Sequence, residues 1–409
     1  MNPWCFDFVS SFAYLQLQRL DTLRARLALT QVPVVLGALF NQAGQRGPAG
    51  IPAKRTFTYR FVNNRGASAV QACAGLHRAT FQENIPLRAI REDPDMRIGL
   101  VIDSACDLPQ DYIQRHHIGI LPIAVRSDSQ TFSDARDPDA TLRFFRESLG
   151  DRAHDAETIP YSVEQIEQLF LERLVLDYDC VFCLTITATR SPIHANAARA
   201  SFAILKDYRP VRKKAGVEGP FLMRVIDTQT LFAGQAPSAV EAVRLIAAGE
   251  SPGRIRERLE QVAQNSYGYM LPRDLYYLRS RAQKKGDRSV GWLSATLGSA
   301  LDIKPLLRGY RGQTGPVGKV RGFDHGAEVL FAYAAERVRA GLMVPALALS
   351  YGGDLAEMHA LPGHAALAAT CDEQGVPLLE SVMSITGMVN VGAGALTVGF
   401  AAEPHPVTF

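Results

Sequence analysis

Short apolar runs alternate with amphipathic segments along most of the chain from residue 97 onward. The runs end abruptly at Ser, Thr, Asp or Pro, which is typical of buried parallel strands that lead into helix N-termini. Predicted strands span 98–102, 119–125, 181–187 and 221–226. Predicted helices span 108–116, 142–149, 162–177 (with Ser162 and Gln165 spaced as a capping box), 192–206, 236–248 and 251–264. This alternation predicts a largely parallel sheet with helices on both faces.

The pattern changes after about residue 266. A helix is predicted over 274–284, and an apolar stretch of small residues over 290–301 precedes a predicted strand over 303–307. The alternation continues through 330–340, 347–350 and 365–374. We therefore expect an α/β fold in two parts, a first domain over 97–265 and a second, smaller α/β domain over 266–409.

Residues 1–96 differ from the rest of the chain. The first 95 residues carry about 11 Lys and Arg against 6 Asp and Glu. An amphipathic helix is predicted from Ser10 to Leu29, the apolar segment 32–40 is too short to span a bilayer, and 41–52 is a Gly- and Pro-rich linker. We interpret this region as an extension without an assigned role, either partly disordered or added by a start codon placed too early.

Composition predicts a soluble protein. The 409 residues are 47% hydrophobic and 21% charged, with a formal net charge of +3, so the chain can bury a large core. The sequence has neither the basic stripe of a nucleic-acid-binding protein nor an apolar stretch near the roughly 20 residues of a membrane-spanning helix. We interpret the basic cluster at 212–214 as a solvated loop.

Six cysteines are scattered along the chain at positions 5, 73, 106, 180, 183 and 371, without the spacing of a disulfide framework. This usage favours a reducing, cytoplasmic setting. Cys180 and Cys183 lie within one predicted strand, where residues three apart point to opposite faces. We therefore expect core packing for these two thiols and not redox or metal chemistry.

Two hydroxyl-bearing turns are the strongest chemical signal. One follows the apolar run at 98–102 and contains Ser104, and the other follows 181–187 and contains Ser191. At such junctions free backbone N–H groups and the positive end of a helix dipole can hold an anion. Ligands of parallel α/β sheets lie beyond the carboxyl ends of the strands, near which Ser104, Thr158 and Ser191 all fall. The sequence therefore predicts a carboxylate or phosphate site.

These residues also carry a resemblance to a known family. Residues 103–109 read Asp-Ser-Ala-Cys-Asp-Leu-Pro and resemble the "DSTxDLP" motif of DegV-family fatty-acid-binding proteins, the B subunits of fatty acid kinases. Further matches follow in the family's order at 187–197 ("SSxLSGTYQSA"), 225–228 with Gly234 ("VxDS…G"), 275–278, 302–307, Gly312 and 319–321 ("LxYL…LxIKPIL…G…KVR") and 392–396 ("HTGPGAL"). The resemblance covers about 98–400 and implies a two-domain fold with an acyl chain between the lobes.

The resemblance implies roles for individual residues. Ser191 matches the family's carboxylate-binding serine, although Ser-Pro at 191–192 is also a simple helix start. Thr158 matches a loop hydroxyl that reaches the carboxylate, and Ser104 is expected mainly to hold the first turn. Asn390 stands where the family has a His; it can donate a hydrogen bond but cannot transfer a proton. His194 either compensates for that His or faces solvent on its helix.

The implied function is that of a carrier. The protein is expected to bind a long-chain fatty acid, without a cofactor, and to present its carboxylate to a separate ATP-dependent fatty acid kinase for phospholipid synthesis. Lys304 and Arg321 match family positions and are candidates for docking that kinase, with plain solvated charges as the alternative.

Two other functions stay open. A Ser-dependent hydrolase would use Ser191, His194 and either Asp103 or Asp227, although the sequence has neither a G-x-S-x-G elbow nor a phosphate-cradling G-x-x-x-x-G-K-[ST] loop. A binder of a different, small carboxylate would use the same turns without an apolar cavity large enough for an acyl tail. We predict a binding protein and not an enzyme.

Overall fold

A computed structural model describes residues 2–6, 29–33, 96–127, 130–148, 156–284, 302–407 and 409. The chain divides into two compact units, Met1–Arg91 and Glu92–Phe409. In the first unit, β1 (Asn2–Phe6) pairs in parallel with β2 (Leu29–Pro33). Three predicted segments lie outside the described residues: the linker at 41–52, the apolar stretch at 290–301 and the helix from Ser10 to Leu29, of which only Leu29 is described, as the first residue of β2.

The four-stranded sheet of the second unit is fully parallel. Its order is β4-β3-β8-β9. The strands are β3 (Ile98–Asp103), β4 (Gly119–Leu121), β8 (Cys180–Thr185) and β9 (Leu222–Asp227). The predicted parallel sheet is confirmed, but the strand predicted over 119–125 is two strands. Pro122 has no N–H for a sheet hydrogen bond, and the chain changes sheets there.

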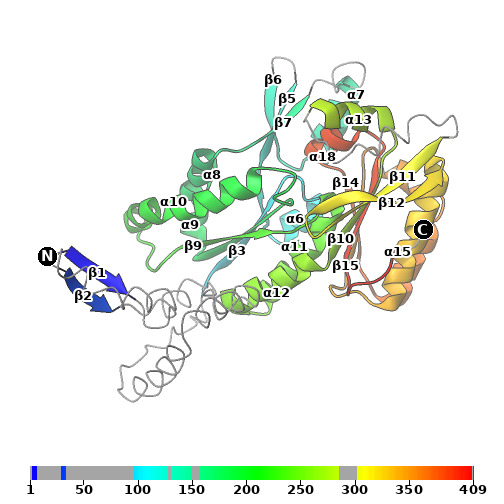
Figure 1. The fold of residues 1–409 in the computed structure, drawn as a ribbon. Coiled ribbons are helices and arrows are strands. Elements are labelled where there is room, and N and C mark those ends of the chain that lie inside the picture. The colour runs from blue at the N-terminus through cyan, green and yellow to red at the C-terminus, as the bar shows by residue number, and fades with distance from the viewer. Residues whose placement is uncertain are drawn as a thin grey trace, which may run out of the picture. The chain divides into compact units, whose positions relative to one another are not determined.

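Helices cover both faces of this sheet (Figure 1). One face packs α6 (Gln110–Arg115), α11 (Ala236–Ala247) and α12 (Pro252–Gln264); the other packs α8 (Val163–Leu169), the π-helical turn Phe170–Leu174, α9 (Val175–Asp177) and α10 (Ile193–Lys214). The strand period of two separates the faces: Cys180 packs with the first set and Cys183 with the second, and both thiols are free and buried, as expected.

The helix termini show which local predictions were right. Ser162 Oγ accepts the N–H of Gln165 at 3.2 Å while Gln165 Oε1 accepts the N–H of Ser162 at 2.9 Å, so the capping box is confirmed. The prediction of a solvated loop at 212–214 was wrong, because α10 continues to Lys214. Arg212 is only 1% exposed and its guanidinium lies 2.5 Å from the carboxylate of Asp179.

A small antiparallel sheet stands beside the parallel one, in the order β6-β5-β7. Its strands are β5 (Ile123–Ser127), β6 (Gln130–Asp134) and β7 (Glu157–Pro160), and α7 (Pro138–Ser148) follows β6 in the chain. The sequence pattern did not predict this sheet beyond the start of β5. Its consequence for the site is that Thr158 lies on a strand, paired with Val125, and not in a loop.

Residues after 265 form a six-stranded sheet in the order β12-β11-β10-β15-β13-β14. Its strands are β10 (Ser266–Leu271), β11 (Ile303–Tyr310), β12 (Gln313–Arg321), β13 (Leu347–Tyr351), β14 (Leu378–Val382) and β15 (Leu396–Ala401). The helices of this part are α13 (Leu275–Lys284), α15 (Phe323–Ala340), α16 (Leu355–His359), α17 (His364–Gln374) and α18 (Ile385–Val391). Only β13 and β14 pair in parallel, so this sheet is mostly antiparallel although helices and strands alternate in sequence.

The two large sheets meet across α11, which contacts both β3 and β15, and across the 3₁₀ turn Phe232–Gln235, which contacts β10, β13 and β15. The approach is close because glycines lie at the contact. A Cβ on Gly399 would lie 1.9 Å from the carbonyl oxygen of Ala233, and one on Gly234 would lie 2.8 Å from the Cα of Gly268. Any side chain at Gly399 would force the two parts of the fold apart.

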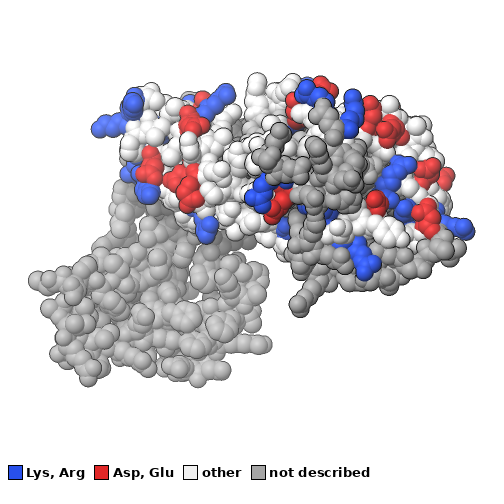
Figure 2. All heavy atoms as spheres, turned by 90° about the horizontal axis from the view of Figure 1, so that it is seen from above, with Lys and Arg blue, Asp and Glu red and all other residues white. Residues whose placement is uncertain are grey.

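Charge on the described surface is mixed in sign. On the face seen in Figure 2, Lys and Arg are interspersed with Asp and Glu at both the left and the right of the view. Such interspersed charge is typical of a solvated surface. None of the described helices has the length and hydropathy that a membrane span requires.

Candidate functional site

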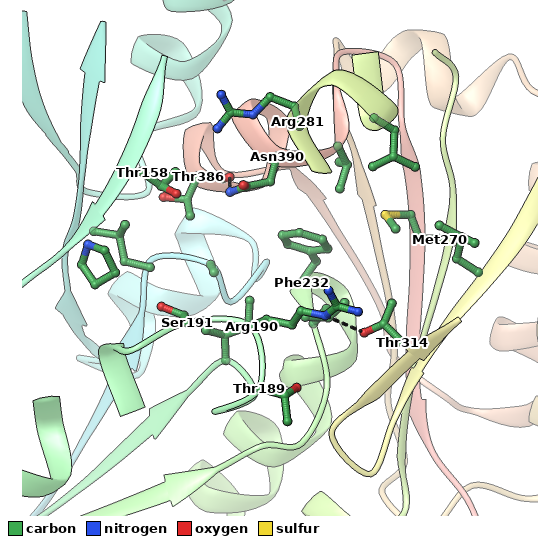
Figure 3. Close-up of a pocket in the computed structure, with 18 of the residues that line it drawn as sticks. Thr158, Thr189, Arg190, Ser191, Phe232, Met270, Arg281, Thr314, Thr386 and Asn390 are labelled. Carbon is green, nitrogen blue, oxygen red and sulfur yellow. Dashed lines mark hydrogen bonds between the residues drawn. The ribbon is translucent and has the colours of Figure 1, made fainter. Parts of the chain in front are cut away.

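A cavity of about 540 Å³ lies where the three sheets of the second unit approach one another. Its wall combines residues from both parts of the fold (Figure 3). The lining residues are Ala105, Ile123, Thr158, Pro160, Ile186, Thr189, Arg190, Ser191, Pro192, Leu231, Phe232, Met270, Leu278, Arg281, Leu307, Thr314, Gly315, Thr386, Asn390 and Val391. Such a volume is in the range of cavities that enclose ligands the size of a drug or a lipid.

One side of the cavity is apolar. Phe232, Met270, Leu278 and Leu307 belong to one buried hydrophobic cluster, and the ring of Phe232 points into the space between the two sides in Figure 3. Phe232 has a φ of 48°, a left-handed conformation that is rare for a bulky residue and costs about 1–3 kcal/mol. The surrounding packing must hold Phe232 in this conformation, which places its ring at the cavity wall.

The other side of the cavity is polar. Thr158, Ser191, Thr386, Asn390 and Arg281 line it, and Thr158, Thr386 and Asn390 lie next to one another in Figure 3. Three of the five sequence-predicted ligand residues, Thr158, Ser191 and Asn390, are therefore brought together. They come from β7, the turn before α10 and α18, which are far apart in the sequence.

Ser191 bonds the start of α10 and also lines the cavity. Its Oγ accepts the backbone N–H of Ile193, the first residue of α10, at 3.2 Å. Since a serine hydroxyl can donate one hydrogen bond and accept others, the O–H of Ser191 can still donate to a ligand in the cavity. Capping and ligand binding are thus compatible at this residue.

Asn390 and Thr386 lie one turn apart on α18. The side-chain amide of Asn390 donates to the backbone carbonyl of Thr386 at 2.7 Å, and the N–H of Thr386 donates to Asp134 Oδ2 at 2.8 Å. These bonds fix the helix against β6. The amide dipole of Asn390 therefore has a fixed orientation at the cavity wall, but it brings no charge.

Ser104 and His194 do not line the cavity. Ser104 is fully buried, its Oγ accepts the N–H of Ile123 at 3.0 Å, and it lies 3.5 Å from the hydroxyl of Thr386. It holds the first turn, as the sequence indicated. His194 Nδ1 lies 2.9 Å from the hydroxyl of Thr185, so its ring is engaged with the end of β8 and not with the ligand space.

The acidic residues of the first motif tie the fold together. Asp103 is fully buried and accepts the N–H groups of Ile186 at 2.6 Å and Ala105 at 3.1 Å, which joins the end of β3 to the end of β8. Burial raises the pKa of Asp103 to about 7 despite these donors. Asp107 accepts hydrogen bonds from Arg136 at 2.9 Å and from Ser350 at 2.6 Å, which connects the motif to β13.

The hydrolase triad is not assembled among the described residues. Ser191 Oγ accepts from Ile193, and His194 contacts Thr185. The Asp103 carboxylate is held by backbone N–H groups, and that of Asp227 accepts the N–H groups of Gln229 and Ala188. No cluster of metal-ligating side chains lies among the described residues of the cavity wall.

Arg281 is a cavity residue that the sequence analysis missed. It lies on α13, is 5% exposed, and donates from Nη1 to the carbonyl of Ala156, just before β7. Its Nε has no hydrogen-bond partner in the structure. The other arginines of the described chain that are at least nine-tenths buried, Arg136 and Arg212, each form an ion pair with an aspartate, whereas no ion pair involves Arg281 in the described part.

Arg190 and Thr189 connect the turn before α10 to the β11–β12 hairpin. Arg190 Nε donates to the hydroxyl of Thr314 at 3.3 Å, drawn in Figure 3, and Thr189 Oγ1 donates to the carbonyl of Gly312 at 2.5 Å. Gly312 has a φ of +76°, which favours glycine in this tight turn. These bonds close the wall of the cavity between the two parts of the fold.

The two candidate docking residues lie on β11 and β12 and not on the cavity wall. Lys304 has a side chain that is 15% exposed, and its ammonium lies 3.0 Å from the carboxylate of Asp302 and donates to the carbonyl of Arg273 at 2.9 Å. Arg321 ends β12 and is exposed. Of the two, only Arg321 presents its charge mainly to solvent.

Comparison with known proteins supports the same fold. Over residues 97–403 the chain matches the profile of a family described as uncharacterised proteins of the DegV family. A DegV domain-containing protein of Xanthomonas campestris pv. campestris is 63% identical over 310 residues, which cover 76% of this chain and 99% of that protein. One from Xanthomonas axonopodis pv. citri is 62% identical over the same shares of both chains.

Solved structures agree with the architecture. DegV of Bacillus subtilis, a fatty acid binding protein, has a TM-score of 0.58 at 20% identity, covering 75% of this chain and all of that one. A stearic acid-binding protein of Eubacterium ventriosum has a TM-score of 0.60 at 22% identity, covering 75% of this chain and 98% of that one. At these identities the likeness concerns the fold. The profile match and the close relatives show that this chain belongs to the DegV family.

Proposed function

We propose that this protein carries one long-chain fatty acid in the cavity, with the acyl tail against the apolar side and the carboxylate at the polar side. The observation that carries the proposal is the division of one 540 Å³ cavity into an apolar wall and a cluster of hydroxyl, amide and guanidinium groups. An amphipathic ligand with one anionic end matches this division. The related structures described as fatty-acid-binding and stearic acid-binding proteins support the same ligand class.

The energetics favour a long chain. Burial of some fifteen methylenes at about 0.8 kcal/mol each gives on the order of 12 kcal/mol of gross transfer free energy. This exceeds the cost of ordering a flexible chain by enough to give tight binding. A small carboxylate would leave most of the apolar wall without a partner, which argues against the small-ligand alternative.

The carboxylate needs partners because an unpaired buried ion is very costly. We infer that Arg281 supplies the countercharge, with Ser191 and Thr158 donating hydroxyl hydrogen bonds. The support is that Arg281 lines the cavity, is 5% exposed, and lacks the aspartate partner of the other two buried arginines of the described chain. A bound carboxylate would neutralise this guanidinium. Asn390 would then contribute an oriented dipole in place of the family's His.

The fatty acid is proposed to be phosphorylated by a separate ATP-dependent kinase subunit, which yields an acyl phosphate for phospholipid synthesis. The support is the sequence resemblance to kinase B subunits together with the lack of a phosphate-cradling G-x-x-x-x-G-K-[ST] loop in the chain itself. Arg321 is proposed as a docking contact because it is exposed at the end of β12. A cytoplasmic location is consistent with the free thiols of Cys106, Cys180, Cys183 and Cys371.

A binding experiment tests the ligand class. The delipidated full-length chain is titrated with palmitic acid and with butyric acid by calorimetry. The proposal expects about one equivalent of palmitate and no measurable binding of butyrate at millimolar concentration. Equal affinity for the two acids would contradict it and would favour the small-carboxylate alternative.

The kinase step is tested separately. Palmitate-loaded protein is incubated with ATP, with and without an ATP-binding fatty acid kinase subunit, and acyl phosphate is trapped with hydroxylamine. Product is expected only with the kinase, and Arg321→Glu should slow its formation while Arg254→Glu, an exposed arginine on α12, should not. An unchanged rate in Arg321→Glu would exclude this residue as a docking contact.

A further inference from the structure

Two histidines and a glutamate converge at the edge of the six-stranded sheet, away from the lipid cavity. His359 ends α16, His364 begins α17, and Glu380 lies on the edge strand β14. His359 Nε2 lies 3.1 Å from one carboxylate oxygen of Glu380, and His364 Nε2 lies 2.5 Å from the other. The potential ligand atoms of the three side chains all lie within 4.8 Å of one another.

We propose that His359, His364 and Glu380 form a Zn²⁺ site. Two imidazole nitrogens and one carboxylate oxygen are a ligand set that zinc uses with a water molecule in the fourth position. With Zn–N and Zn–O bonds of about 2.0–2.2 Å, tetrahedral ligand atoms lie about 3.4 Å apart. The 3.1 Å between His359 Nε2 and Glu380 Oε2 is close to this value. His364 Nε2 lies 2.5 Å from the other oxygen, Oε1, so the Glu380 carboxylate must turn or shift by about 1 Å for one of its oxygens to join both imidazoles around the metal.

The surroundings of the site limit how far its ligands can move. His364 is 8% exposed and its ring packs edge-on against Phe331, with centroids 5.7 Å apart. The rings of His359 and His364 lie 4.7 Å apart, so both face the same carboxylate. His359 is more exposed, at 47% of its side chain, which leaves the metal position open to solvent for entry and for a water ligand.

Zinc fits this set better than the hard cations. Ca²⁺ and Mg²⁺ take six or more ligands, or a near-octahedral shell, made almost entirely of oxygen, whereas two of the three donors here are imidazoles. A bound Zn²⁺ would join two helices to an edge strand that has a partner on one side only. It would thereby stabilise the fold at this edge, and none of its three protein ligands lines the lipid cavity.

The experiment is a ZnCl₂ titration of the chelator-treated full-length chain, followed by calorimetry and thermal unfolding. Wild type is expected to bind Zn²⁺ and to unfold at a higher temperature with it, while MgCl₂ has neither effect. His359→Gln should weaken the affinity of this site at least tenfold, since a ligand is lost. His325→Gln is the matched control, because the exposed His325 of α15 pairs with Glu328 at 3.3 Å without a second histidine.

Two further results decide the proposal. In histidine NMR spectra, the ring protons of His359 and His364 should shift or broaden together with Zn²⁺, while those of His325 should not. Glu380→Gln should abolish this joint response even if zinc binds elsewhere on the chain. Identical Zn²⁺ binding by wild type, His359→Gln and Glu380→Gln would overturn the proposal and leave the cluster as two hydrogen bonds to Glu380.

Discussion

The two sides of the cavity wall come from different parts of the fold and bring different chemistry. Residues before 265 supply hydroxyls, from Thr158 on β7 and from Ser191 in the turn after β8. Residues after 265 supply the buried guanidinium of Arg281, the amide of Asn390 and much of the apolar surface, including Met270 and Leu307. Recognition of an amphipathic ligand therefore requires both parts, since neither alone offers a tail site and a charged head site.

The two parts are also held together by close backbone packing. Gly399 on β15 leaves no room for a side chain beside Ala233, and Gly268 on β10 lies close to Gly234, since a Cβ on Gly234 would lie 2.8 Å from the Cα of Gly268. The cavity wall is thus set by the junction and not only by the residues that line it. This leads to four predictions.

Gly399→Ala should have the largest effect. The new Cβ meets a backbone carbonyl at 1.9 Å, so the variant should lose on the order of 3 kcal/mol of unfolding free energy. Urea unfolding measures the loss. Gly315→Ala on β12 is the control, because a Cβ there meets nothing within 4 Å. Equal stabilities of the two variants would mean that the two parts do not depend on this contact.

Arg281→Met should come next. A hydrogen bond to a charged group contributes about 1.5–3 kcal/mol, so palmitate affinity should fall roughly tenfold to hundredfold. Wild type should prefer palmitate over hexadecanol, and the variant should lose that preference. Arg279→Met on the same helix, which does not line the cavity, should bind as wild type does. A preserved preference in Arg281→Met would remove the guanidinium from the carboxylate site.

Ser191→Ala and Thr158→Val should have smaller effects. Each removes a neutral hydrogen bond of about 0.5–1.5 kcal/mol, so affinity for palmitate should fall roughly twofold to tenfold. Ser201→Ala on α10 is the control, since that hydroxyl donates to the carbonyl of Ala198 at 2.7 Å and does not line the cavity. If Ser191→Ala lowered the affinity for palmitate more than Arg281→Met does, the hydroxyl groups and not the guanidinium would contribute most to carboxylate binding.

Asp103→Asn should change the pH dependence of stability. Burial raises the pKa of Asp103 to about 7 in the folded state, above its unfolded value near 4, so the folded state binds the extra proton between these values. This group therefore makes wild type lose stability as pH rises from about 4 to 7, and the variant should lack that contribution. Urea unfolding at several pH values measures it, with exposed Asp111→Asn as control. Identical slopes in wild type and Asp103→Asn would contradict the raised pKa.

Part of the polar side of the cavity could be predicted from sequence, because its signal lies within a few residues of each strand. Buried parallel strands read as apolar runs whose polar ends fall at one edge of the sheet, which grouped Ser104, Thr158 and Ser191 without a structure. Ser191 lines the cavity from such a strand end, whereas Ser104 does not line it and Thr158 lines it from a strand of the separate antiparallel sheet. The two cysteines of β8 were placed correctly by the same period of two.

The role of Arg281 in the polar side of the cavity could not be predicted in this way. Arg281 lies on a helix whose sequence contains other basic residues, and only the packing of α13 on α18 and β7 distinguishes it. The mostly antiparallel six-stranded sheet was also missed, because its strands β12, β14 and β15 lack a clear period. The available signal was the match at 275–278, which marked the start of α13 but not the arginine that follows it.

The most direct test of the account is mass spectrometry of lipids extracted under denaturing conditions from the purified full-length protein. Wild type should contain about one long-chain fatty acid per chain, and Arg281→Met, purified in the same way and with its folding verified by circular dichroism, should contain markedly less. A folded wild-type protein that contains no fatty acid and takes up no added palmitate would contradict the central claim that the cavity holds an acyl ligand.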